Sequence, residues 1–166
     1  MKFDVQYVVP GTPLGARAVA ISLRALFENI VPLASDAPLL ELAVTEVMNN
    51  IAIHSYGDQR KGDMRVHVEF SGKTLNITVW DKGKGPDYKN VKKTYKLPKQ
   101  KENSSQTDLR PNGRGLFVVS KIVDSIGYDK IGDENKILLT KDIAQTSPPK
   151  EGEIDPHIHP TNGHSE

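Results

Sequence analysis

The stretch of sequence that decides the fold is residues 45–54, Thr-Glu-Val-Met-Asn-Asn-Ile-Ala-Ile-His. Its polar side chains Glu46, Asn50 and His54 recur at every fourth position, so a helix places all three near one face. The amide oxygen of Asn50 is a suitable hard ligand for Mg²⁺. A carboxylate one turn earlier can orient or deprotonate a hydroxyl group. The alternative interpretation of the same pattern is an ordinary polar helix face.

Two glycine-containing motifs follow in the chain. Residues 81–85, Asp-Lys-Gly-Lys-Gly, come directly after an apolar alternating stretch. The acid at the strand end can accept a hydrogen bond from a ligand amine, and the glycines permit close backbone approach. Residues 113–116, Gly-Arg-Gly-Leu, open an apolar helix whose free N–H groups favour phosphate. Taken alone, these motifs are also compatible with a polar turn and a flexible entry into a helix.

Hydrophobic periodicity predicts the elements around these motifs. Helices are expected at residues 14–30, 38–56 and 115–126, and strands at 3–9, 64–70, 74–80, 127–131 and 136–141. Asp36 or Ser35 is expected to cap the second helix, with Pro38 in its first turn. Because strands and helices do not alternate strictly, this order favours an α+β fold, with helices on one face of a mostly antiparallel sheet.

Composition limits the class of protein. The chain has 166 residues, 22 basic against 21 acidic, a net charge of +1 and no cysteine. The length suits about one domain. The balanced charge argues against direct binding of nucleic acid, and the missing cysteine excludes disulfides and thiolate metal sites. No apolar run reaches the roughly 18–20 residues of a membrane span. A cytoplasmic protein without membrane attachment is therefore expected.

Two segments contribute little to a core. Residues 87–112 contain six lysines and one arginine against three acids, a net charge of +4, and show no clear period. A loop of this length in a small domain is usually functional or disordered. Residues 145–166 contain four prolines, three of the five histidines and few apolar residues, which is typical of a disordered tail.

The order of the motifs resembles that of the Bergerat ATP-binding fold of gyrase, MutL and histidine kinases. Within this GHKL superfamily, the chain most resembles the anti-sigma-factor serine/threonine kinases of bacterial partner-switching systems, over about residues 3–142. The resemblance implies a two-layer sandwich with helices on one face of a mixed, mostly antiparallel sheet. It further implies an ATP-binding kinase domain at residues 1–144, with an ATP lid at about 86–112.

The family pattern also implies roles for individual residues. Glu46 matches the acid implicated as general base, Asn50 the Mg²⁺-binding residue, and Asp81 the residue that hydrogen-bonds the adenine amino group. The remaining residues expected on the nucleotide side are His54, Gly83, Gly85, Gly113, Arg114, Gly115 and Leu116. The segment between the glycine motifs is long and basic for this family, and the tail has no counterpart in its pattern.

The function that the resemblance implies is an ATP- and Mg²⁺-dependent serine/threonine kinase that also acts as a switch. Its partners would be a STAS-domain anti-anti-sigma protein, which it phosphorylates, and a sigma factor or other effector, which it sequesters. A homodimer is also expected. One alternative is an ATP-binding sequestration module without phosphotransfer. Another is a detached histidine-kinase domain, although no helix pair with a phosphoacceptor histidine is found.

Overall fold

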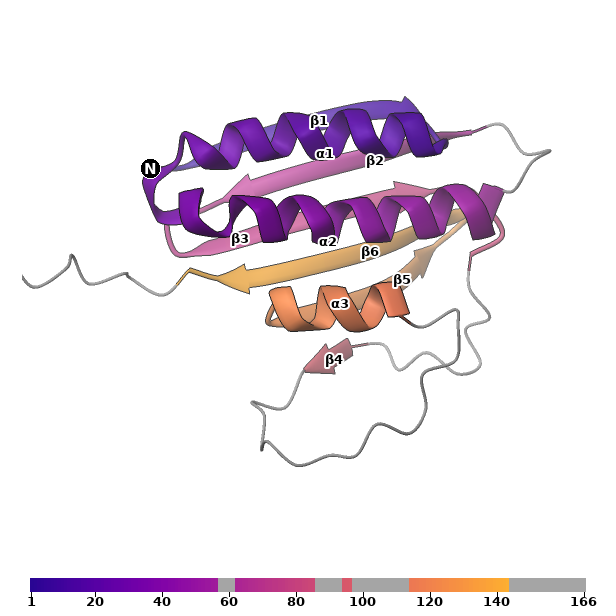
Figure 1. The fold of residues 1–166 in the computed structure, drawn as a ribbon. Coiled ribbons are helices and arrows are strands. Elements are labelled where there is room, and N and C mark those ends of the chain that lie inside the picture. The colour runs from indigo at the N-terminus through magenta and orange to yellow at the C-terminus, as the bar shows by residue number, and fades with distance from the viewer. Residues whose placement is uncertain (57–61, 86–93, 97–113, 144–166) are drawn as a thin grey trace, which may run out of the picture.

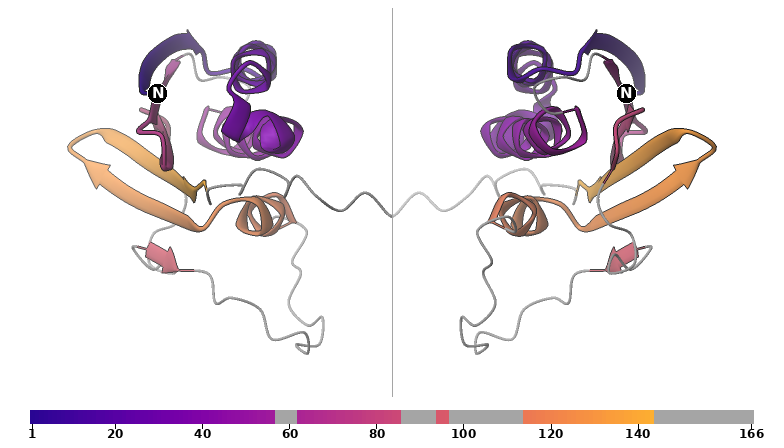
Figure 2. Two further views of the ribbon diagram at one scale, coloured as in Figure 1. Left: turned by 90° about the vertical axis from the view of Figure 1, so that its left-hand side faces the viewer. Right: turned by 90° about the vertical axis from the view of Figure 1, so that its right-hand side faces the viewer.

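The chain forms two layers, a sheet and a row of helices on one of its faces. The computed structural model describes residues 1–56, 62–85, 94–96 and 114–143. The elements are, in chain order, β1 (Phe3–Pro10), α1 (Pro13–Glu28), η1 (Val31–Asp36), α2 (Ala37–Asn50), η2 (Ile51–Tyr56), β2 (Asp63–Phe70), β3 (Thr74–Asp81), β4 (Thr94–Lys96), α3 (Arg114–Ile122), β5 (Ser125–Ile131) and β6 (Glu134–Asp142). Figures 1 and 2 show α1, α2 and α3 side by side on the same face of the strands.

The sheet has six strands in the order β1-β2-β3-β6-β5-β4. Every pairing among the described strands is antiparallel, so no parallel component is seen there. The predicted α+β sandwich with helices on one face is confirmed. The β5–β6 hairpin lies between β3 and β4. Because β6 pairs antiparallel with β3, the end of β3 lies beside the start of β6. Asp81 is thereby paired with Asn135.

The core lies between the two layers. In β2 the alternate residues Met64, Val66, Val68 and Phe70 are buried beneath the helices. The period-two pattern that predicted this strand is therefore confirmed. Each large apolar side chain buried in this way contributes about 1.5–3 kcal/mol relative to an exposed one. This packing fixes α2 over the middle of the sheet, which decides where its polar face lies.

The start of α2 agrees with the prediction in its position but not in its capping hydrogen bond. The 3₁₀ helix η1 runs directly into α2, so Asp36 already has helical backbone angles, φ −92° and ψ −9°. Asp36 is the N-cap residue and Pro38 lies in the first turn, as predicted, but the Asp36 side chain makes no capping hydrogen bond. A capping side chain needs an extended backbone at its own residue to reach back to the helix. The Asp36 carboxylate instead lies 3.4 Å from Lys141 Nζ, on the final strand.

Two helix ends also differ from the prediction. The helix expected through Tyr56 is α-helical only to Asn50 and continues as the π-helix η2. The helix expected through Ile126 ends at Ile122, and β5 begins at Ser125. The N–H of Asp124 donates to the carbonyl of Thr140 at 2.9 Å, so the backbone joins β6. A short apolar run fits a helical stripe and a strand equally well, and the neighbouring strand decides between them.

A strand also occurs within the segment predicted as the lid. Residues 94–96 form β4, which pairs antiparallel with β5 at one edge of the sheet. The rest of the predicted lid and the predicted tail lie outside the described residues. Among the described helices, none has the length and apolar character needed to cross a membrane.

Candidate functional site

The first turn of α3 lies directly against the polar face of α2. A Cβ atom at Gly115 would overlap the carboxylate of Glu46 and would lie 3.3 Å from Nδ2 of Asn50. Only glycine allows the two helices to approach this closely without displacing those side chains. Glu46 and Asn50 are both half-buried. The structure thus brings together three predicted site residues from two segments distant in sequence.

A second group of polar residues surrounds the end of β3. Asp81 is 3% exposed, and its Oδ1 accepts hydrogen bonds from the Gly83 N–H at 2.8 Å and from Asn135 Nδ2 at 2.9 Å. Burial raises the pKa of Asp81 above its ordinary value. Hydrogen bonds from Asn135, Gly83 and the Ser55 side chain act in the opposite direction, because they favour the charged form. The carboxylate is held in one orientation within a buried setting.

The loop after β3 is docked onto the end of η2. The Lys84 N–H donates to the carbonyl of Ser55 at 3.0 Å. A Cβ at Gly83 would overlap the Ser55 backbone, so this contact requires glycine. Gly85 has φ +71°, a left-handed conformation that also favours glycine. The predicted need for glycine at these two positions therefore has a structural cause.

Tyr56 holds the same loop from its other side. Its hydroxyl donates to the carbonyl of Asp63 at 2.8 Å and accepts from the Lys82 N–H at 3.0 Å. The ring lies against Gly11 and Gly62, where any Cβ would overlap it. Burial raises the pKa of Tyr56, so the hydroxyl keeps its proton and its donor role. Tyr56 therefore connects the loop at Lys82 with the start of β2 and with the turn at Gly11.

The π-helix changes the expected position of His54. The prediction assumed that an α-helix would continue through this residue, which would align it with Glu46 and Asn50. In a π-helix hydrogen bonds run from i to i+5, so the turn is wider than the α-helical turn that the prediction assumed. His54 is exposed, whereas Ser55 and Tyr56 are buried. Within the described part of the chain, no hydrogen bond or ion pair joins His54 to Glu46 or Asn50.

The remaining predicted residues fall at the margins of the described structure. Gly113 lies outside the described residues. Arg114 begins α3, so its backbone is placed there. Leu116 is 45% exposed beside Gly115, on the outer side of the helix. That Gly113, Arg114 and Leu116 contact the nucleotide therefore stays a prediction.

Asn135 is a site residue that the sequence analysis missed. It is fully buried, and its Nδ2 donates to both Asp81 Oδ1 and, at 3.1 Å, the carbonyl of Gly83. Residues 132–135 are polar and suggest a turn, which concealed the role of the last of them. One signal in the sequence could have indicated this role. Asn135 is an amide residue next to the final strand, which could be expected to pair with the strand that ends at Asp81.

These features define a class of ATP-binding domain. Residues 10–141 match the family described as histidine kinase-like ATPase domain. Because the match covers most of the chain, the protein belongs to this family. The resemblance to the GHKL superfamily is confirmed, and membership implies ATP binding.

Two curated relatives describe the branch of the family to which this chain is similar. An anti-sigma F factor of Anoxybacillus flavithermus (strain DSM 21510 / WK1) is 22% identical over 127 residues, covering 76% of this chain and 83% of the relative. The serine-protein kinase RsbW of Staphylococcus aureus (strain MSSA476) is 24% identical over 123 residues, covering 74% and 76%. A solved structure, the histidine kinase domain from Erythrobacter litoralis EL346 blue-light activated histidine kinase, matches with a TM-score of 0.47 and 16% identity, over 78% of this chain and 62% of that one.

Proposed function

We propose that this protein is an ATP- and Mg²⁺-dependent serine/threonine kinase that also acts as an anti-sigma-type switch. The observation that carries the proposal is the convergence of Glu46, Asn50 and Gly115 at the start of α3. The substrate is a STAS-domain anti-anti-sigma protein, and the sequestered partner is a sigma factor or other effector. The names of the relatives, anti-sigma F factor and serine-protein kinase, support the two halves of this function.

The residues present fit both Mg²⁺ and the adenine base of ATP. An amide oxygen and a carboxylate, on Asn50 and Glu46, are the hard oxygen donors that Mg²⁺ prefers. Gly115 brings the first turn of α3 against both side chains, since a Cβ there would overlap the Glu46 carboxylate. The ionised carboxylate of Asp81 is an acceptor suited to the amino group of adenine. In this proposal Asn50 is the metal ligand and Asp81 recognises the base.

Bound ATP supplies the γ-phosphoryl group, and Mg²⁺ neutralises negative charge on the phosphates. The protein's own contribution is mainly positioning. Asp81, held by Asn135, fixes the base at one end of the site. The N–H groups in the first turn of α3 favour negative charge beside Gly115. Glu46 orients the substrate serine or threonine hydroxyl and accepts its proton.

Glu46→Gln tests the transfer step. The change keeps the size of the side chain but removes the base, so nucleotide affinity should change little. Phosphotransfer should fall by about 10²–10⁴-fold, the usual contribution of general-base catalysis. The measurement is transfer from γ-labelled ATP to a STAS-domain protein from the same organism, beside a binding titration with a fluorescent ATP analogue.

Glu41→Gln is the matched control on the same helix. Glu41 pairs with Arg24 of α1 at 3.0 Å, on the side away from Gly115, so its variant should transfer phosphate normally. Wild-type transfer by Glu46→Gln would overturn the base assignment. A second outcome is that the unchanged protein binds nucleotide tightly and captures its partner without transferring phosphate. That result would overturn the kinase proposal and favour the sequestration module.

A further inference from the structure

The face of the sheet opposite the helices carries two acidic side chains directly across from each other. Asp4 of β1 is paired with Glu69 of β2. Both are exposed, because their neighbours along β1 and β2 point to the core. Like charges directly opposite in an antiparallel pair destabilise it. This position on the open face therefore favours a cation.

A histidine lies between the two carboxylates. Nε2 of His67 is 2.7 Å from Oδ1 of Asp4, and Nδ1 is 3.9 Å from Oε2 of Glu69. The imidazole stacks on the ring of Trp80 with centroids 6.2 Å apart and planes at 25°. Arg65 covers the same indole at 4.9 Å. The imidazole is thus held in place by its aromatic neighbour, while both carboxylates can still rotate.

We propose that Asp4, His67 and Glu69 form a binding site for a divalent transition-metal ion of the Zn²⁺ class. One ligand atom from each of the three residues can be chosen so that all lie within 4.8 Å of one another. Ligands about 2.0–2.2 Å from a tetrahedral Zn²⁺ ion lie closer together than that, and small rotations of the carboxylates bring them there. An imidazole with two carboxylates suits Zn²⁺ or Co²⁺ better than Mg²⁺ or Ca²⁺.

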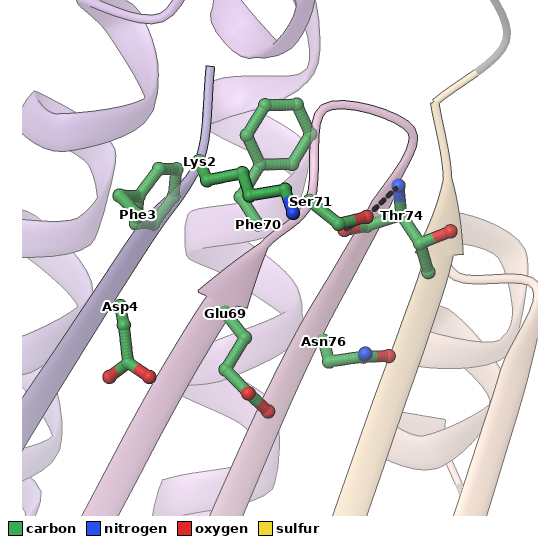
Figure 3. A pocket seen from close by; sticks show the side chains of 8 residues that line it. All are labelled: Lys2, Phe3, Asp4, Glu69, Phe70, Ser71, Thr74 and Asn76. Carbon is green, nitrogen blue, oxygen red and sulfur yellow. Dashed lines mark hydrogen bonds between the residues drawn. The ribbon is translucent and has the colours of Figure 1, made fainter.

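Space for the remaining coordination positions adjoins the carboxylates. A cavity of about 470 Å³ is lined by Asp4, Glu69, Asn76, Lys2 and four further residues. Figure 3 shows the side chains of Asp4, Glu69 and Asn76 projecting from three neighbouring strands on this face. Water can therefore complete the coordination sphere. Lys2 is the competing cation, although no ion pair joins it to Asp4 or Glu69 among the described residues.

Metal binding at this site would tie the edge strand β1 to β2. β1 is the first strand of the sheet order and, among the described strands, has a neighbour on one side only. An ion that bridges Asp4 to the two β2 residues exists only in the folded pairing. It therefore stabilises the folded chain by mass action.

Trp80 allows a local test, because it is the only tryptophan in the chain. In nucleotide-free protein, Co²⁺ should quench the fluorescence of Trp80, since a paramagnetic ion at His67 lies close to the indole. Zn²⁺, which does not quench, should compete and restore the signal. His67→Gln, Asp4→Asn and Glu69→Gln should each move the Co²⁺ midpoint upward by about tenfold or more, because each removes a ligand.

Two control variants separate this site from other metal binding. Glu134→Gln changes a carboxylate on the same face, which pairs with Arg65 at 3.0 Å, and should leave the midpoint unchanged. Replacing His157, His159 and His164 together by alanine, in the full chain, should also leave it unchanged. Unchanged quenching in His67→Gln, or its loss in the triple variant, overturns the proposal. If His67→Gln does not fold, the variants of the exposed Asp4 and Glu69 decide the question.

Discussion

At the scale of single residues, Asp81 combines a stability penalty with its proposed role in binding adenine. Burial raises its pKa from the ordinary value of 3.8, so the folded state holds this proton more tightly than the unfolded state does. The contribution of Asp81 to the free energy of unfolding is therefore complete at pH values below its ordinary pKa. That contribution is lost as the pH rises through the raised pKa of the folded protein. At neutral pH the ionised, partly desolvated group therefore costs stability, as binding sites often do.

Asp81→Asn should separate these two effects. The amide oxygen can still accept from Gly83 and Asn135, so the ligand-free melting temperature at pH 7 should equal or exceed that of the unchanged protein. ATP affinity should fall by roughly 10–100-fold, since a hydrogen bond to a charged group is worth about 1.5–3 kcal/mol. The checks are calorimetry and nucleotide titration. The stability difference between the two proteins should grow from pH 3 to neutral pH, and a difference that shrinks would contradict the assigned pKa direction.

At the scale of elements, the loop after β3, which lies on the proposed adenine side of the site, depends on how η2, β2 and β3 meet at Tyr56. Tyr56→Phe keeps the ring between Gly11 and Gly62 but leaves the Lys82 N–H and the Asp63 carbonyl without this partner. Each unpaired, partly buried group costs about 1–3 kcal/mol. We expect a lower melting temperature and, because the loop carries Gly83, weaker nucleotide binding as well.

Tyr7→Phe is the matched control for this variant. Tyr7 is a half-buried tyrosine of β1 that packs against the same core, away from the loop. It should leave nucleotide affinity unchanged. If Tyr56→Phe lowers the melting temperature but binds nucleotide as tightly as Tyr7→Phe, the tyrosine stabilises the fold without positioning the site.

The same elements show what the sequence could predict. Alternating residues determined β2 and β3, because side-chain period and burial are local properties of a strand. Gly83 was singled out for close backbone approach, and the Ser55 backbone beside it leaves no room for a Cβ. Asn135 and the π-helix η2 were missed because both depend on contacts with distant segments. Asn135 acquires its role only beside Asp81, 54 residues earlier in the chain.

At the scale of the whole molecule, nucleotide should stabilise the fold, because the proposed site joins α2, α3, β3 and β6. A ligand at about 100 times its Kd adds about 2.7 kcal/mol, which corresponds to a rise in melting temperature of roughly 5–10 °C for a domain of this size. Thermal unfolding with and without millimolar Mg-ATP measures this rise. Mg²⁺ alone is one control and Asp81→Asn the other. A melting temperature that does not respond to Mg-ATP would exclude the proposed site.

The position of the last hairpin within the sheet has a consequence for biosynthesis. Among the described strands β6 is made last, yet it lies in the interior of the sheet, between β3 and β5. A nascent chain on the ribosome can assemble β1, β2 and β3, but β3 then presents an unpaired edge until β6 emerges. Such an edge is open to pairing with other chains. The proposed adenine site is therefore complete only after β6 has been synthesised, and we expect ribosome-stalled chains that stop before Asn135 to need a chaperone.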